Sequence, residues 1–126
     1  MRAVDTDVLV RLITRDDANQ AASADAFIQR GAWVSVLALA EATWVLSAVY
    51  ECSAADLATA VAMLLDHRDL TLQDLDVVAA ALDLFRSPPS VGFSDCLMLQ
   101  LARKAGHLPL GTFDRRLGKV EETQKL

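Results

Sequence analysis

Cysteine, histidine, glycine and proline are scarce in this 126-residue chain, and each shortage excludes a class of protein. Two cysteines, Cys52 and Cys96, cannot form a disulfide framework. Both sit inside apolar helical patterns, which favours reduced, buried thiols in a reducing cytoplasm over a disulfide. With only two histidines, far apart in the sequence, no Cys/His cluster indicates zinc. Five glycines and three prolines are too few for a fibrous or disordered chain.

Signals for secretion or membrane insertion are also lacking. The acids Asp5 and Asp7 come before any apolar stretch of signal-peptide length. The stretch Ala32–Tyr50 carries one charge, Glu41, at its middle, and a charge at a bilayer centre costs about 2.5–3.5 kcal/mol. We therefore expect a buried strand and helix here, in a cytoplasmic protein without a membrane span.

The charge balance is acidic. Twelve basic residues stand against 17 acidic ones, which gives a net charge of −5 and argues against a broad basic face for nucleic acid. Divalent cations held by several of the acids would reverse the local field that a phosphate meets. Net charge therefore leaves binding of nucleic acid open.

Short strand-like runs alternate with helical spacing of apolar residues along the chain. Strands are expected before Asp5, at 32–36, at 70–72 and at 107–111, with a possible fifth near the C-terminus. Parallel strands need crossover connections, so this alternation predicts an α/β fold with a parallel sheet of four to five strands covered on both faces. The length predicts a single domain, residues 1–126.

Helix boundaries and faces can also be predicted, and the stretch Ser87–Ser90 is the clearest break in the chain. Thr6 or Asp7 is expected to cap the first helix, and Ser94 the helix that Gly106 ends. In the helix after residue 36, Glu41 shares a stripe with Leu37, Trp44, Val45 and Ala48, which predicts that it lies on the apolar face. An ionised carboxylate seldom sits there unpaired, so Glu41 is a functional acid, a salt-bridge partner of an arginine, or an acid at the stripe's edge.

Three further acids stand at comparable places. Asp5 ends the first strand, where an acid opens onto the crevice beyond the sheet. Asp95 opens a helix, where the helix dipole alone would favour a carboxylate, although helical spacing also aligns it with Met98 on the buried side. Asp114 could be a plain N-cap of one helical turn at 114–118. The carboxyl ends of parallel strands meet at one edge, so we expect these three acids and Glu41 to face one cleft.

Four carboxylates in one cleft repel one another unless cations join them. Carboxylates suit hard ions such as Mg2+ and Mn2+. A site of this kind can lower the pKa of a bound water and stabilise an in-line displacement at phosphorus. Asp7, two residues after Asp5, is either a helix cap or a neighbour of the metal.

Four stretches carry a resemblance to a known family: Ala3–Arg11, Leu39–Leu46, Phe93–Gly106 and Gly111–Leu117. Together, and in this order, they resemble PIN-domain proteins, specifically the VapC toxin ribonucleases of bacterial toxin–antitoxin pairs. The resemblance implies a three-layer α/β/α sandwich and an Mg2+- or Mn2+-dependent ribonuclease that leaves 5′-phosphate and 3′-hydroxyl ends. It also implies a homodimer inhibited by a small cognate antitoxin whose arginine reaches the acidic site.

The same resemblance assigns roles to individual residues. Thr112 matches a small hydroxyl residue that helps to position metal-bound water or phosphate, and Asp7 stands where many relatives have Asn, which adds a negative charge beside the site. The metal ligands that the resemblance implies are Asp5, Glu41, Asp95 and Asp114.

Two other functions compete with a nuclease. The stretch Val4–Leu9 also resembles the nucleophile motif of haloacid-dehalogenase-like phosphatases, in which Asp5 would attack phosphorus and Asp7 would act as acid and base. The chain is short for that fold, and the motif leaves Glu41 without a role. A PIN-like scaffold that binds RNA or protein without cutting is the non-enzymatic alternative, and it predicts that one of the acids is missing.

Basic residues that could contact RNA phosphates are scattered along the chain. For each of them, a plain solvated surface charge is an equally good interpretation. The candidates are Arg11, Arg15, Arg103, Arg115, Arg116 and Lys119.

Overall fold

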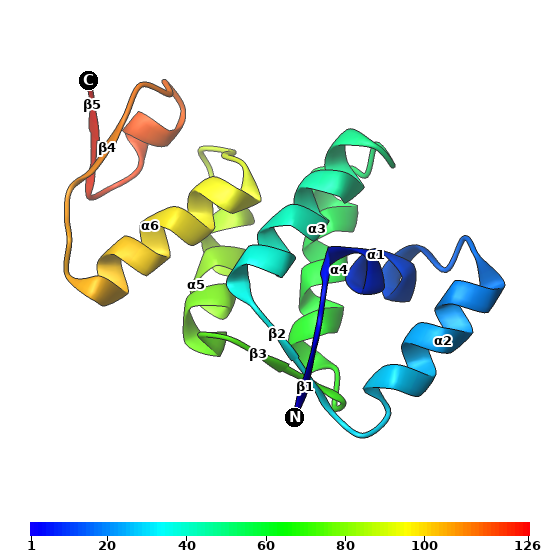
Figure 1. Cartoon of the computed structure of the whole chain (residues 1–126). Helices are drawn as coiled ribbons and strands as arrows, with labels where there is room; N and C mark the ends of the chain where they lie inside the picture. Colours follow the sequence, from blue (N-terminus) through cyan, green and yellow to red (C-terminus); the bar gives the residue numbers. More distant parts are fainter. The chain divides into compact units, whose positions relative to one another are not determined.

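The computed structural model describes residues 1–126 and divides the chain into two compact units, Met1–Leu75 and Asp76–Leu126 (Figure 1). The first unit contains β1 (Arg2–Val4), α1 (Thr6–Thr14), α2 (Ala18–Ile28), β2 (Ala32–Val34), α3 (Val36–Ala48), α4 (Ala54–Asp66) and β3 (Leu70–Leu72). The second contains α5 (Leu75–Phe85), α6 (Phe93–Ala105), β4 (Leu110–Thr112), the 3-10 helix η1 (Leu117–Lys119) and β5 (Thr123–Lys125).

The first unit is built on a three-stranded parallel sheet in the order β1-β2-β3. Val4 is paired with Val34, and Val34 with Leu72, so the three strands end level with one another. The residues directly after β1 and β2, Asp5 and Ser35, therefore lie at one edge of this sheet. The predicted carboxyl-end arrangement is confirmed for these strands.

Helix α1 begins at that edge. Its cap is Asp5, whose Oδ1 accepts a hydrogen bond from the Val8 amide at 3.2 Å, so the prediction of Thr6 or Asp7 as the cap is wrong. The cap side chain has to precede the first helical residue, and Thr6 is already helical. The acid that ends β1 thus also starts α1.

Helix α3 differs from its predicted face and start. Ser35 caps it through the Ala38 amide at 3.0 Å, which stops β2 two residues before the predicted Val36. Leu37 is 68% exposed and Trp44 65% exposed, so the stripe predicted to be buried around Glu41 faces outward. The helix is apolar on almost every side, and helical spacing alone therefore marked the wrong face. Its buried face consists of Ala38, Leu39, Ala42, Thr43 and Leu46.

The second unit begins with two helices separated by the predicted break at 87–90. Phe85 and Phe93 pack edge to face across this break, with ring centroids 5.6 Å apart. Helix α6 is capped by Gly92 without a side-chain hydrogen bond, so the predicted cap Ser94 is wrong; Ser94 lies in the first turn. Gly106 ends the helix at φ 80°, a left-handed conformation that favours glycine, as predicted.

The C-terminal strands form a second parallel pair. β4 begins at Leu110, three residues later than the predicted start at His107. It pairs with β5, which is the possible fifth strand expected near the C-terminus. The five strands are therefore hydrogen-bonded in a group of three and a group of two. The predicted α/β class with parallel strands is confirmed, and no helix has both the length and the apolar character needed to cross a bilayer.

The two cysteines are free thiols. Cys96 is buried in α6, where burial and, second, the negative charge of Asp95 raise the pKa of its thiol to about 11. Cys52 is partly exposed and lies in the loop between α3 and α4, outside the helical pattern expected for it. Neither cysteine forms a disulfide, and the expected burial is confirmed for Cys96 and wrong for Cys52.

Candidate functional site

The first unit brings two of the predicted acids into one hydrogen-bonded arrangement. Asp5 is exposed at the N-terminus of α1, and Glu41 is exposed on α3, which packs against α1. Thr6, the residue after Asp5, donates its hydroxyl to Glu41 Oε2 at 2.8 Å. Thr6 thus connects the two acid-bearing helices and orients the Glu41 carboxylate.

Sequence reasoning missed this role of Thr6 because it treated the residue as a possible helix cap. The available signal was a hydroxyl directly beside the acid that ends β1. The salt bridge to an arginine that was considered for Glu41 is not present: none of the ion pairs in the structure includes Glu41 or Asp5. Neither of these two acids therefore has a basic partner in the structure.

The second unit contains the other two acids. Asp95 is half-buried in the first turn of α6. Burial, and then the negative charge of Asp114, raises the pKa of the Asp95 carboxyl above its ordinary value. Asp114 thus acts electrostatically on Asp95. Neither acid belongs to an ion pair. The predicted alignment of Asp95 with a buried Met98 is wrong, since Met98 is 50% exposed.

Asp114 is fixed at the start of the turn that leads into η1. Its Oδ1 accepts a hydrogen bond from the Leu117 amide at 2.7 Å, and its own amide donates to Thr112 Oγ1 at 3.0 Å. Asp114 therefore does cap a turn, as the structural alternative proposed, although the helical segment is shorter than the predicted 114–118. The residue is exposed, and only Oδ1 takes part in this capping hydrogen bond.

The donor chemistry fits a hard divalent cation. Each unit supplies two carboxylates and one hydroxyl residue that is hydrogen-bonded to an acidic residue: Thr6 to Glu41 in the first unit, and Thr112 to the amide of Asp114 in the second. None of the four carboxylates has a basic partner. Oxygen ligands of this kind suit Mg2+ or Mn2+. Within neither unit do three or more acidic, histidine or cysteine side chains gather around a point. Each pair taken alone would leave most ligand positions to water or phosphate.

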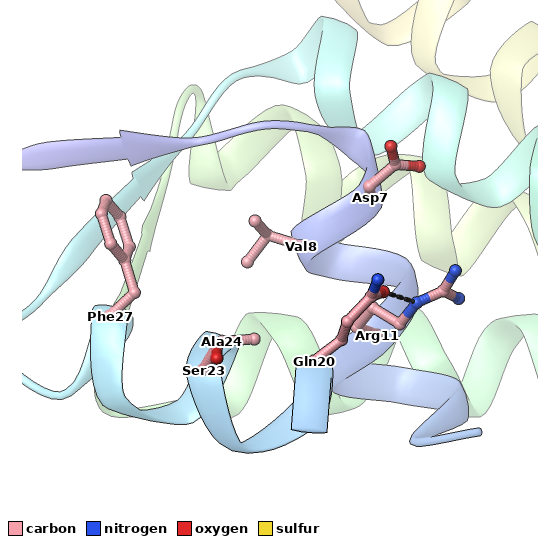
Figure 2. A pocket seen from close by; sticks show the side chains of 7 residues that line it. All are labelled: Asp7, Val8, Arg11, Gln20, Ser23, Ala24 and Phe27. Carbon is pink, nitrogen blue, oxygen red and sulfur yellow. Dashed lines mark hydrogen bonds between the residues drawn. The ribbon is translucent and has the colours of Figure 1, made fainter. Parts of the chain in front are cut away.

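Asp7 lies at one end of a groove of about 480 Å³ between α1 and α2. Figure 2 shows Val8, Ala24 and Phe27 along its apolar part and the Asp7 carboxylate directed away from them. Because Asp5 is the helix cap, the cap interpretation of Asp7 is wrong, and its exposed carboxylate adds charge to the first turn of α1.

Three of the basic candidates are held by contacts within the protein. Arg11 donates to Gln20 (Figure 2) and to Tyr50, and the Tyr50 hydrogen bond is the main cause that raises the Arg11 pKa. Arg15 makes two hydrogen bonds to Asp25, at 3.1 and 2.6 Å.

Arg103 Nε lies 2.9 Å from Glu122 Oε1, and its guanidinium also donates to the Glu121 carbonyl. By contrast, Arg115, Arg116 and Lys119 are exposed around η1 and belong to none of the ion pairs. These three remain candidates for phosphate contacts.

Comparison with known proteins identifies the family. The model of the PIN domain family matches residues 2–123, which runs through both units, whereas no curated protein and no solved structure matches significantly. PIN domains typically are metal-dependent ribonucleases and generally bind divalent metals. The match agrees with the parallel α/β elements and argues against the phosphatase interpretation of Asp5 and Asp7. Since it covers nearly every residue, the chain belongs to the PIN-domain family.

Proposed function

We propose that this protein is a metal-dependent endoribonuclease, the toxin of a VapC-like toxin–antitoxin pair. Its four acids, Asp5, Glu41, Asp95 and Asp114, would hold Mg2+ or Mn2+ together, with Thr112 beside them. The observation that carries the proposal is that two pairs of carboxylates in a PIN-domain chain are left without any basic partner. We further propose that the two units act as one domain, residues 1–126, because each contributes half of the acids.

When bound, the cation makes water a stronger nucleophile at neutral pH and offsets the charge that develops at phosphorus. The protein's part is to hold its oxygens in place. Asp5 is fixed by the amide of Val8, and Glu41 by the hydroxyl of Thr6. Asp114 is fixed by the amide of Leu117. Exposed carboxylates keep a route open for an RNA strand.

The same unpaired acids support the proposed regulation. A cognate antitoxin that inserts an arginine among the four carboxylates would neutralise part of their charge and exclude RNA, since a guanidinium forms paired hydrogen bonds with carboxylates. We propose a homodimer in the cytoplasm as the form that the antitoxin binds. Size-exclusion chromatography with light scattering would measure the mass of the free protein.

The function is tested by cleavage of an end-labelled, structured RNA with purified full-length protein in Mg2+, Mn2+ or EDTA. We expect cuts that leave 5′-phosphate and 3′-hydroxyl ends, disappear in EDTA and disappear in Asp5→Asn. The matched control is Asp83→Asn, which removes the same charge from an exposed position on α5. This control is expected to cut at the wild-type rate.

Two results would contradict the proposal. A folded wild-type protein that binds several RNAs but cuts none of them in any metal would be a non-catalytic scaffold. Release of phosphate from a small phosphomonoester, without RNA cleavage, would instead support the phosphatase interpretation of Asp5 and Asp7.

Thr6→Val is expected to reduce cleavage and Mn2+ affinity about 10- to 100-fold, the usual effect of losing a partner that orients a metal ligand. The change removes the hydroxyl that donates to Glu41 at 2.8 Å and keeps the side-chain volume. Thr6→Ser keeps the hydroxyl and should retain most of the activity. Calorimetric titration with Mn2+ separates the metal effect from the RNA effect. Equal Mn2+ affinity in Thr6→Val and wild type would remove Thr6 from the site.

A further inference from the structure

Phe113 is the most exposed aromatic residue of the second unit. Its side chain is 80% exposed and stands between Thr112 and Asp114. The other two aromatic residues of this unit, Phe85 and Phe93, pack edge to face against each other. Phe113 therefore contributes little to the packing of its own unit.

The backbone on both sides of Phe113 is held in place. The Thr112 carbonyl accepts a hydrogen bond from the Leu126 amide at 2.9 Å, and the Thr112 hydroxyl accepts one from the Asp114 amide. Asp114 in turn accepts from the Leu117 amide. An aromatic ring on such an anchored bend loses little conformational freedom when it stacks on a ligand, because χ1 and χ2 are its only free rotations.

The sequence that follows the ring is rich in basic residues, although the whole chain has a net charge of −5. Between Thr112 and Lys119 there are three basic residues, Arg115, Arg116 and Lys119, and one acid, Asp114. The three cations are exposed and make no ion pair. An exposed aromatic ring together with unpaired cations is the combination that binds single-stranded nucleic acid: bases stack on the ring, and phosphates meet the cations.

We propose that Phe113 is a stacking platform for one unpaired base beside the phosphate to be cut, and that Arg115, Arg116 and Lys119 contact the neighbouring phosphates. This inference rests on the proposed ribonuclease function and adds Phe113 as a residue that holds the RNA in place. Inside a duplex every base is already stacked and paired, so an exposed ring can engage only a base from a loop, a bulge or a single strand. The enzyme therefore selects unpaired RNA and has little preference for base identity at the stacked position.

The test uses full-length protein with the cleavage-disabling change Asp5→Asn and an RNA hairpin that carries a fluorescent adenine analogue at one loop or stem position. Stacking on an aromatic ring quenches such a base. We expect quenching at one loop position and none in the stem. Adding Phe113→Ala should abolish the quenching and weaken binding about 5- to 150-fold, as expected for the loss of one stacked base. Phe113→Trp should preserve both.

Two matched variants separate stacking from other effects. Leu108→Ala removes another partly exposed apolar side chain of the same unit and should change neither the quenching nor the affinity. Arg115→Ala should reduce the dependence of binding on salt concentration while the quenching persists, because it removes a phosphate contact and not the ring.

The inference is overturned if Phe113→Ala binds the loop RNA and quenches the analogue as its parent does. It is also overturned if the change affects only the association of protein copies measured by sedimentation. Cleavage assays without the Asp5 change run in parallel. If wild type cuts loops and Phe113→Ala cuts them equally well, stacking is wrong and the nuclease stands. If wild type cuts no RNA, the proposed function itself fails.

Discussion

Asp95→Asn is expected to lose RNA cleavage by at least about a hundredfold and yet to unfold at a higher temperature than wild type without metal. The loss follows from removing a proposed metal ligand, since even partners that only orient such ligands are worth 10- to 100-fold. The gain follows from the raised pKa of Asp95, caused by burial and then by Asp114. The uncharged Asn side chain removes the free-energy cost of keeping a half-buried carboxylate ionised near another acid.

The pH dependence of this effect has a definite sign. A carboxyl whose pKa is higher in the folded than in the unfolded state binds its proton more tightly when folded, so stability falls as pH rises through that window. In EDTA, the advantage of Asp95→Asn should therefore be full at neutral pH and vanish at pH values below the ordinary carboxyl pKa. Thermal unfolding in EDTA across this pH range measures it.

Added Mn2+ should raise the melting temperature of wild type above that of Asp95→Asn, because an ion that binds only the folded wild type stabilises it by mass action. Asp83→Asn is the control and should show neither the loss of cleavage nor the gain in stability. Asp95→Asn that cuts at the wild-type rate would remove Asp95 from the site. A fall in melting temperature at neutral pH in EDTA would show that the charge of Asp95 is stabilised by the fold.

Leu39→Ala is expected to lower the free energy of unfolding by about 2–5 kcal/mol, the usual cost of a cavity left by a buried leucine. Leu39 is 1% exposed on the inner face of α3, the helix that carries Glu41. Leu37→Ala, on the outer face of the same helix at 68% exposure, should change the free energy by less than about 0.5 kcal/mol.

Urea unfolding followed by tryptophan fluorescence distinguishes these two variants. A larger effect of Leu37→Ala would mean that the outer face of α3 is covered in solution, for example by a second copy of the chain. Equal effects would mean that the two faces of α3 are packed alike.

The sequence predicted the elements better than their faces. Apolar runs and turn residues located the helices and strands, because local spacing is visible in the sequence. The predicted buried face of α3 was wrong, since a helix that is apolar almost all round gives no contrast between its sides, and packing against α1 and α4 decides which side is buried. β5 could be expected only as a possible strand without defined bounds, because the polar run Thr123–Lys125 becomes a strand only through its pairing with β4.

Individual site residues show the same limit. The position of Asp5 at the end of β1 could be predicted from the apolar run before it. The hydrogen bond from Thr6 to Glu41 could not, since it joins residues 35 positions apart that meet only when α1 packs on α3. Whether Arg11 or Arg115 is available to RNA was likewise a question of tertiary partners: Arg11 is occupied by Gln20 and Tyr50, and Arg115 is not paired.

The pairing of β4 with β5 has a consequence for protein synthesis. Thr112, next to Phe113 and Asp114, is held by the amide of Leu126, so this part of the site depends on residues that leave the ribosome after it. A nascent chain that stops before Thr123 lacks the strand that positions β4. β4 therefore gains its parallel partner only after Lys125 has been synthesised, later than Asp114, which follows β4 in the sequence.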